Sequence, residues 1–204
     1  MHVVSDKGNS FSKIKWLKTA TSPNWIELAI RNPIELLIDH AHCERKAAGV
    51  AVQMMFRYLC EPGLAEVLSP LAREELEHFE RVLGILRSRD HCLRPLPAPP
   101  YGALLAKNIR KGEPKRMLDS FLVSGLIEAR SHERMTLLAS HSPDSELRDL
   151  YRELLISEAR HFSIYLNLAK ERFDKPVITS RLKELSEIES TILSALHTEP
   201  RMHS

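Results

Sequence analysis

The 204-residue sequence has little glycine, little cysteine and no long hydrophobic run. It contains 7 glycines, and so few turn-forming residues favour long helices over a turn-rich β fold. The 3 cysteines, Cys43, Cys60 and Cys92, are an odd number without paired spacing. That pattern argues against a disulfide framework and favours a reducing compartment. We therefore expect an all-α protein of the cytoplasm.

Membrane and secretory signals are also missing from the pattern. The most apolar run, residues 47–56, carries Gln53 and is too short to span a bilayer. Residues 1–16 lack the apolar core of a signal peptide, so we expect no membrane association. The net charge is +2, which permits a nucleic-acid partner without indicating one. The length suits a single domain over residues 1–204.

Apolar residues recur at steps of three and four in four long segments, which predicts helices at about 33–60, 63–88, 115–140 and 143–173. The first begins with Asn32 as N-cap, Pro33 at the first helical position, and Glu35 placed to reach back to the cap. A further amphipathic helix at about 178–196 should pack outside the others, because it carries no ligand-type residue on an apolar face. We expect residues 1–22 and the tail 198–204 to be loose.

Pro70 interrupts the second long segment. If a helix began there, Glu75 would lie only one turn inside it, whereas Glu44 lies about four turns from the end of its own helix. Antiparallel partners must bring such residues to similar depth, and the apolar seam continues through Pro70. We therefore predict one helix over 63–88, bent at the proline.

Two Glu-x-x-His motifs dominate the helical segments. Glu75 and His78 form the first, and Glu158 and His161 the second. Residues three apart share one helix face, so each motif directs a carboxylate and an imidazole to the same place. Lone acidic residues stand on apolar seams 31 and 30 residues earlier, at Glu44 and Glu128.

One carboxylate from each of two helices, with Glu-x-x-His from each of two others, is the ligand set of ferritin-like dimetal proteins. The sequence thus predicts a ferritin-like four-helix bundle with additional peripheral helices. Two divalent ions would cancel the charge of four carboxylates, which are unfavourable on an apolar seam by themselves. Ligands without thiolate suit iron or manganese better than structural zinc. The competing interpretation is surface glutamates beside satisfied core histidines.

Several neighbours could contact the predicted ligands without binding metal. His132, Asp39 and Tyr165 are candidates, as are Cys43, Arg130 and Arg134. Packing is an equal alternative for His132 and the default for Tyr165. His40 and His42 could contact ligands or lie at the surface, and Glu74 and Glu77 are expected in solvent or in ion pairs.

Between the two helical pairs, residues 90–116 form a long connector, whose proline-dense stretch 94–102 we expect to be extended. The connector ends in five basic residues within ten positions: Lys107, Arg110, Lys111, Lys115 and Arg116. This cluster is either a solvated connector or a site for phosphate groups.

The stretches LLIDHAHCERKAA, LAREELEHFERVL, GLIEARSHERM and LLISEARHFSIYL resemble the tRNA 2-methylthio-N6-isopentenyladenosine hydroxylases. The resemblance covers about residues 33–170. It implies a monooxygenase with two iron ions, O2 as co-substrate and an external electron donor, either a reductase or a ferredoxin. By this analogy the six glutamates and histidines are the iron ligands. The substrate would be a modified adenosine in the tRNA anticodon loop, and the basic cluster would hold phosphates.

Other functions remain open at this point. Iron storage would require a large closed assembly, and rubrerythrin-like peroxide detoxification is usually accompanied by a Cys-x-x-Cys pair, which the sequence lacks. A radical-generating reductase subunit, an oxygenase acting on a small molecule, and a helical interaction module without metal are further alternatives. The oligomeric state does not follow from the sequence.

Overall fold

The computed structural model describes residues 16–196 and 199–204, and this part of the chain is helical without strands. The helices are α1 (Pro23–Arg31), α2 (Pro33–Arg57), α3 (Leu64–Ser88), α4 (Tyr101–Ala106), α5 (Lys115–His141), α6 (Ser145–Arg172) and α7 (Lys175–Ala195). The predicted all-α class is confirmed. Among these helices, none has both the length and the apolar character needed to cross a membrane.

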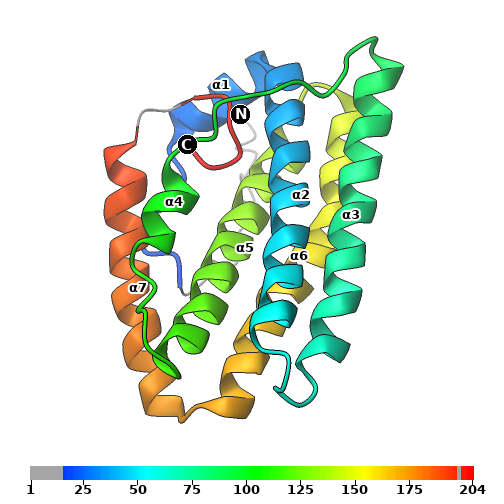
Figure 1. Ribbon diagram of the computed structural model, residues 1–204. Coiled ribbons are helices and arrows are strands. Elements are labelled where there is room, and N and C mark those ends of the chain that lie inside the picture. Colours follow the sequence, from blue (N-terminus) through cyan, green and yellow to red (C-terminus); the bar gives the residue numbers. More distant parts are fainter. Residues whose placement is uncertain (1–15, 197–198) are drawn as a thin grey trace, which may run out of the picture.

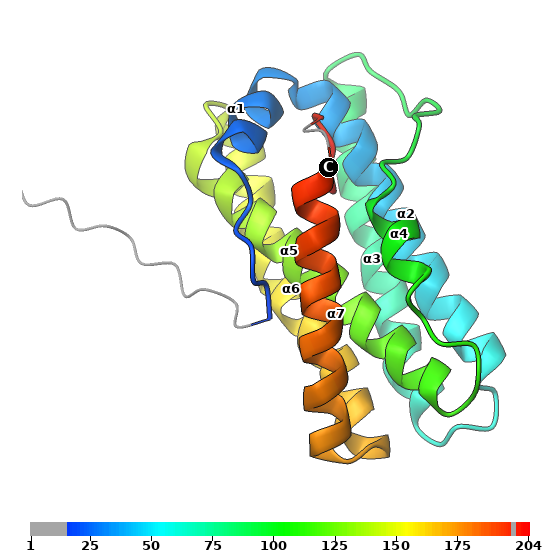
Figure 2. The ribbon, with the colours of Figure 1, turned by 90° about the vertical axis from the view of Figure 1, so that its left-hand side faces the viewer.

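Four long helices form two antiparallel hairpins that pack together (Figure 1). One hairpin is α2 with α3, and the other is α5 with α6. Because α3 ends and α5 begins at opposite ends of the bundle, the connector between them travels its length and includes α4 (Figure 1). Two hairpins joined by one long crossover are the ferritin-like arrangement. Figure 2 shows α7 along the outside of this bundle.

The start of α2 differs in detail from the sequence prediction. Pro33 occupies the first turn as expected, but Asn32 makes no side-chain cap hydrogen bond. Glu35 does not reach back to the cap, because it accepts hydrogen bonds from Arg201 at 2.8 Å and Arg94 at 3.0 Å. The predicted capping box is therefore wrong, and Glu35 instead ties α2 to two distant segments.

Helix α3 is continuous through Pro70. The turn before α3 contains Gly63 at a φ of 72°, a left-handed conformation that glycine adopts without strain. Starting at Leu64 rather than at Pro70 places Glu75 and His78 about three and four turns inside the helix. This depth lets them face the middle of α2.

The buried apolar side chains form two clusters with a polar layer between them. On α2, Ala41 belongs to one cluster and Ala51 to the other. On α6, Leu154 belongs to the cluster of Ala41, and Tyr165 belongs to the cluster of Ala51. The residues between these positions include the carboxylates and imidazoles of the predicted centre. The bundle core is therefore apolar toward both ends and polar in the middle.

Segments expected to be loose are packed against the bundle. Leu17 is 4% exposed and Met202 is 1% exposed. The Met202 amide donates to Asp39 at 2.7 Å, and the Trp25 indole donates to the Arg201 carbonyl at 2.8 Å. The prediction of loose ends is wrong for residues 16–22 and 199–204, because distant partners hold both. Residues 1–15 and 197–198 lie outside the described residues.

Helix α7 carries a buried acid that its sequence pattern did not indicate. Glu189 is completely buried, where Arg130 pairs with it at 2.9 Å and the Tyr101 hydroxyl donates to it at 2.9 Å. The prediction that this helix has no ligand-type residue on an apolar face is therefore wrong. Glu189 instead joins α4, α5 and α7 through a charged contact.

Candidate metal centre

Six acidic and imidazole side chains from the four long helices meet inside the bundle. They are Glu44 on α2, Glu75 and His78 on α3, Glu128 on α5, and Glu158 and His161 on α6. None is more than 5% exposed. The structure thus brings the complete set of predicted ligands to one place.

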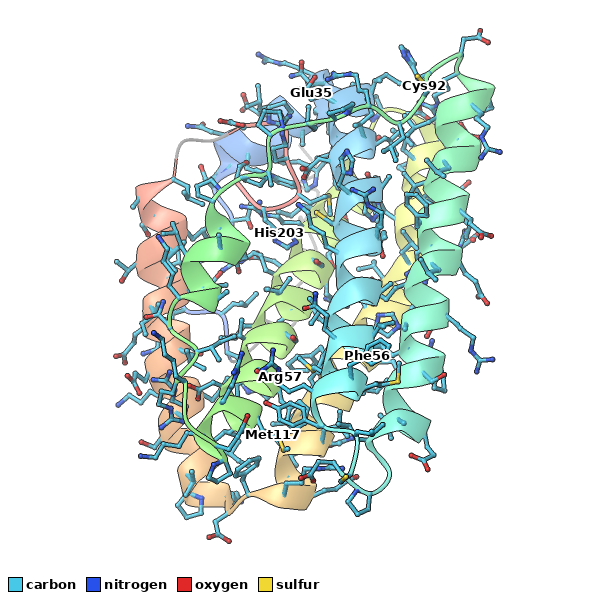
Figure 3. The ribbon with its side chains drawn as sticks, viewed as in Figure 1. Glu35, Phe56, Arg57, Cys92, Met117 and His203 are labelled. Carbon is cyan, nitrogen blue, oxygen red and sulfur yellow. The ribbon has the colours of Figure 1, made fainter. Side chains whose placement is uncertain are left out.

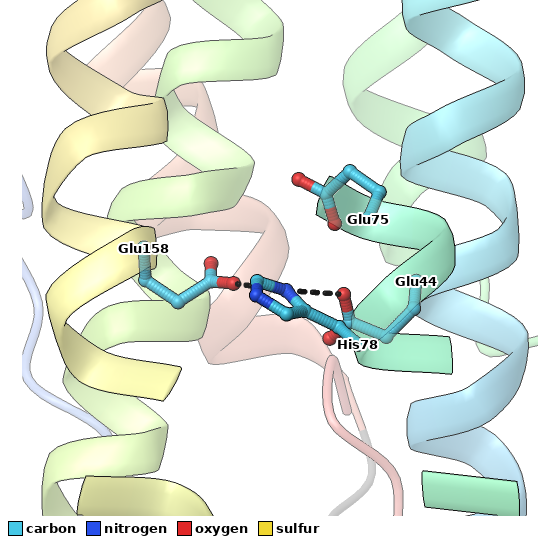
Figure 4. Close-up of side chains that lie close together, drawn as sticks. All are labelled: Glu44, Glu75, His78 and Glu158. Atoms are coloured by element: carbon cyan, nitrogen blue, oxygen red, sulfur yellow. Dashed lines mark ion pairs between the residues drawn. The ribbon is translucent and has the colours of Figure 1, made fainter. Parts of the chain in front are cut away.

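These residues form two overlapping groups, Glu44–Glu75–His78–Glu158 and Glu75–Glu128–His161, in which the candidate ligand atoms lie within 4.8 Å of one another. In the first group, His78 Nδ1 is 3.4 Å from Glu44 Oε2 and 3.9 Å from Glu158 Oε1 (Figure 4). In the second, His161 Nδ1 is 2.7 Å from Glu75 Oε1. Glu75 belongs to both groups and lies where one carboxylate could bridge two ions.

Both histidines turn Nδ1 toward the centre and Nε2 away from it. His161 Nε2 is 2.9 Å from Glu74 Oε2, a carboxylate that only accepts. His78 Nε2 is 3.1 Å from the Ser157 hydroxyl, which donates its own hydrogen to the Leu154 carbonyl at 3.0 Å. The Glu74 carboxylate and the Ser157 hydroxyl oxygen can therefore only accept from these rings, so Nε2 carries the hydrogen in each histidine. Each Nδ1 is left with a lone pair.

When Glu75 is ionised, lone pairs consequently converge without a hydrogen between them. Nδ1 of His78, Nδ1 of His161 and Oε1 of Glu75 are all buried and make no hydrogen bond. The 2.7 Å between His161 Nδ1 and Glu75 Oε1 places two acceptor atoms against each other. Buried acceptors are unfavourable without a positive partner. The arrangement fits metal ions.

Carboxylate electrostatics lead to the same conclusion. Burial, with repulsion from Glu128 and Glu44, raises the pKa values of Glu75 and Glu158 well above their usual range. Burial also raises the pKa of Glu128 to about 7. Burial opposes ionisation of Glu44 as well, but the adjacent His40 lowers its pKa overall. All four carboxylates become ionised together only when cations balance them, and two divalent ions would supply that charge.

His40 supports the centre from α2. Its Nε2 lies 2.6 Å from Glu44 Oε1, and its ring stacks on Tyr151 with centroids 5.6 Å apart. The sequence left open whether His40 contacts a ligand or lies at the surface, and the structure shows the contact. His42 is at the surface, where its ring bonds the Arg94 carbonyl.

Three predicted neighbours have their hydrogen-bond partners elsewhere in the described chain. Asp39 accepts from the Met202 amide, and Arg134 donates to the Met202 and Ser204 carbonyls. Arg130 binds Glu189 on the far side of α5. These residues secure the tail and α7, and no hydrogen bond joins them to the six central side chains.

Tyr165 lies near the centre. It is 1% exposed, and after burial the charges of Glu128 and Glu75 are the main causes that raise its pKa. His132 is half-buried, and burial lowers its pKa. A contact of either residue with a metal ligand stays a prediction.

A cavity of about 850 Å³ lies between α2, α4 with its flanking loops, and α5. Glu128 and Tyr165 are among its lining residues, so it reaches the centre. Much of the wall is apolar: Ala47, Val50, Met54, Val123 and Ile127. Arg57 and His203 also line the cavity and lie at different levels of the molecule (Figure 3).

Basic residues border the same cavity. Of the five predicted from the connector, Arg110, Lys111 and Arg116 line it, whereas Lys107 and Lys115 are not among the lining residues. Lys46 and Arg57 on α2 line it too, and both are exposed. The sequence argument missed these two because they lie 44 and 33 residues before the connector begins at residue 90.

Arg110 has a structural partner as well. It donates to Asp119 through Nε at 2.8 Å and Nη2 at 2.7 Å, and Arg181 of α7 shares the same carboxylate. Arg181 also pairs with Glu184 at 2.7 Å, so two carboxylates balance the two arginines. This cluster holds the end of the connector against α5 and α7.

Two comparisons with known protein sequences agree on one family. A family model described as tRNA-(MS²IO⁶A)-hydroxylase (MiaE) matches residues 10–204. A tRNA 2-(methylsulfanyl)-N(6)-isopentenyladenosine(37) hydroxylase from Pseudomonas putida is 39% identical over 189 residues, covering 93% of this chain and 92% of the relative. One of the same name from Salmonella typhimurium is 27% identical, covering 94% and 88%.

A solved structure is also similar along nearly the whole chain. It is described as Protein 43 with aldehyde deformylating oxygenase activity, from Synechococcus. The two chains are 63% identical with a TM-score of 0.91, and the match covers 94% of this chain and 96% of the other.

Proposed function

The chain belongs to the tRNA-(MS²IO⁶A)-hydroxylase (MiaE) family, and we propose that it hydroxylates the isopentenyl group of 2-methylthio-N6-isopentenyladenosine in tRNA. One structural observation carries this proposal. A largely apolar cavity joins the buried six-residue centre to a basic surface. Along that route the apolar wall would contact the isopentenyl group, and the basic residues would contact the tRNA phosphates.

The six central residues would hold two iron ions, one nearer His78 with Glu44 and one nearer His161 with Glu128. Iron bound there supplies the O2 activation that no side chain provides. The protein contributes the ligand atoms, the hydrogens held on both Nε2 atoms, and apolar clusters on either side that exclude water.

The reaction needs electrons from outside the substrate. Hydroxylation converts R–H, O2, two electrons and two protons into R–OH and one water. The sequence has no flavin or iron–sulfur motif to supply the electrons. We therefore expect a separate donor protein, a reductase or a ferredoxin.

Substrate binding follows from the two kinds of lining. Arg57, Lys46 and Arg116 would hold phosphates near the cavity, because guanidinium and ammonium groups bind the RNA backbone without sequence preference. Val50 and Met54 would contact the isopentenyl group. A base in a single-stranded anticodon loop is free to leave its stack and enter such a site.

Mass spectrometry of nucleosides tests the proposal. Iron-loaded protein is incubated with tRNA carrying the isopentenyl nucleoside, O2 and a reductant. We expect a product heavier by one oxygen atom, which carries ¹⁸O when the gas is ¹⁸O2. A Glu128→Gln protein serves as the matched control. No oxygenated nucleoside with iron demonstrably bound would refute the assignment.

A second candidate activity is oxygen-dependent deformylation of an apolar aldehyde. The Synechococcus protein's description and the apolar cavity wall favour it. An aldehyde R–CHO would yield R–H and formate, consuming O2, four electrons and three protons and releasing one water. Val50 and Met54 would contact the alkyl chain here too.

One pair of substitutions separates the two activities. Arg57→Glu with Arg116→Glu should abolish tRNA hydroxylation and leave aldehyde turnover, measured by gas chromatography of the hydrocarbon, nearly unchanged. If no hydrocarbon and no formate form with wild-type protein, the second activity is excluded.

A further inference from the structure

Glu74 links the two hairpins directly behind one of the candidate ligands. It precedes Glu75 on α3 and extends across to α6, where its Oε2 lies 2.9 Å from His161 Nε2. Its other oxygen pairs with Arg160. The sequence pattern predicted Glu74 in solvent or an ion pair, and the contact with the imidazole adds a different role. The Glu74 side chain is 29% exposed, so the contact is partly shielded from water.

The other histidine has a different outer partner. His78 Nε2 meets the Ser157 hydroxyl at 3.1 Å, and that hydroxyl is neutral. The outer partner of His161 is instead the acidic side chain of Glu74, whose other oxygen pairs with the guanidinium of Arg160. A carboxylate that accepts from one imidazole nitrogen makes the other nitrogen a stronger ligand. A hydroxyl does this far less.

We propose that Glu74 is a positioning residue that makes the two metal positions unequal, so that the ion at His161 is held more tightly than the ion at His78. This inference rests on the metal centre of the proposed function. It does not depend on which substrate the cavity takes. The two hairpins contribute the same types of ligand, and His40 contacts the ligand Glu44 on the His78 side, but Glu74 is the carboxylate that contacts a ligand histidine from outside the centre.

Single-position proteins provide the test, with Co(II) as the probe. His78→Ala leaves the group Glu75–Glu128–His161, and His161→Ala leaves the group around His78. Glu74→Gln is then added to each. Glutamine keeps an acceptor oxygen for the ring nitrogen but removes the charge. In the His78→Ala protein we expect Co(II) affinity to fall about 10- to 100-fold and the visible Co(II) bands to shift. In the His161→Ala protein neither should change.

Two controls make the result specific to Glu74. Arg160→Gln removes the ion pair but leaves the carboxylate on His161, so Co(II) affinity should stay within a few-fold of the parent. Circular dichroism checks that helix content is unchanged. In protein with both histidines, Glu74→Gln should reduce the ratio between the two Co(II) dissociation constants, which makes the test independent of the alanine backgrounds.

Equal weakening in both backgrounds, or no weakening in the His78→Ala protein, would overturn the proposal. Wild-type protein that binds no Co(II) would refute the metal centre and this inference together. If the Co(II) results are as expected but no oxygenated nucleoside forms, the proposed function fails and the role of Glu74 stands.

Discussion

Removing the metal should make the stability of the protein fall as pH rises, and Glu128 allows the size of that fall to be worked out. The Glu128 side chain is buried, and burial, with the charge of Glu44 adding to it, raises its pKa from the ordinary 4.5 to about 7. The folded protein therefore keeps a proton that the unfolded chain releases between these values. The stabilisation is fully present below pH 4.5 and is lost as pH rises through 7. The difference between the two pKa values corresponds to about 3 kcal/mol in the free energy of unfolding. About 2 kcal/mol of this is lost between about pH 5.5 and pH 8.5.

Urea unfolding of metal-free wild-type and Glu128→Gln proteins at those two pH values measures this contribution. Glutamine is neutral throughout, so the stability difference between the two proteins should change by about 2 kcal/mol. His161 and His203 have lowered pKa values and act in the opposite direction below pH 6.5. Both proteins share them, so their effect cancels in the comparison.

Metal-loaded protein is the second arm of this experiment. With cations present the carboxylates are ionised at both pH values, so the pH-dependent gap between the two proteins should disappear. The reasoning fails if the metal-free gap stays constant between the two pH values. It also fails if metal-free wild-type protein gains stability relative to Glu128→Gln as pH rises.

Three further predictions concern the cavity and the peripheral helix. Arg57→Glu and Arg116→Glu should each weaken tRNA binding and lower the salt dependence of the affinity by about one phosphate contact. Filter binding at several salt concentrations checks this. If the slope of log affinity against log salt concentration is unchanged, these residues do not contact phosphates. Glu189→Ala removes one of the two carboxylates that pair with the buried Arg130, the other being Glu133. It should lower the free energy of unfolding by about 1–3 kcal/mol, measured by denaturant unfolding, and no measurable loss would contradict the buried pair. Ala47→Phe should reduce hydroxylation at least about tenfold, because the larger side chain fills the cavity. The number of Co(II) ions bound per protein should not change. Undiminished turnover would show that substrate takes another route.

Helical periodicity predicted the long helices and the candidate ligands, because it shows which residues share one face of a helix. Glu75 and His78 share a face by spacing alone, and the seam shows that this face is buried. The depth argument at Pro70 worked because antiparallel helices must bring ligands to one level. Glu44 and Glu128 were recognisable as acids interrupting apolar seams. All of these are properties of one helix at a time.

Periodicity could not find partners that come from other helices. Glu74 lies off the seam of its own helix, and only the packing of α3 on α6 brings it to His161. Glu189 looked like one solvated acid among several on α7 until Arg130 was placed beside it. The positions of both acids depend on how helices pack together, which a single segment does not encode.

Segments without periodicity were the least predictable. The tail carries no repeating apolar pattern, yet Met202 and His203 are buried. Their contacts with Asp39 and Ser131 join residues more than seventy positions apart. The basic residues of α2 were equally hard to predict, because Arg57 and Arg116 come to the same cavity only through the fold.

With the proposed iron ions bound, the polar layer across the middle of the bundle would tie the lifetime of the protein to iron supply. Each hairpin brings two glutamates and one histidine to this layer, so neither hairpin completes the site without the other. A ligand that binds only the folded form adds its binding free energy to stability. In a cell short of iron, the chain would therefore lose catalysis and resistance to degradation together, and its abundance would follow the metal.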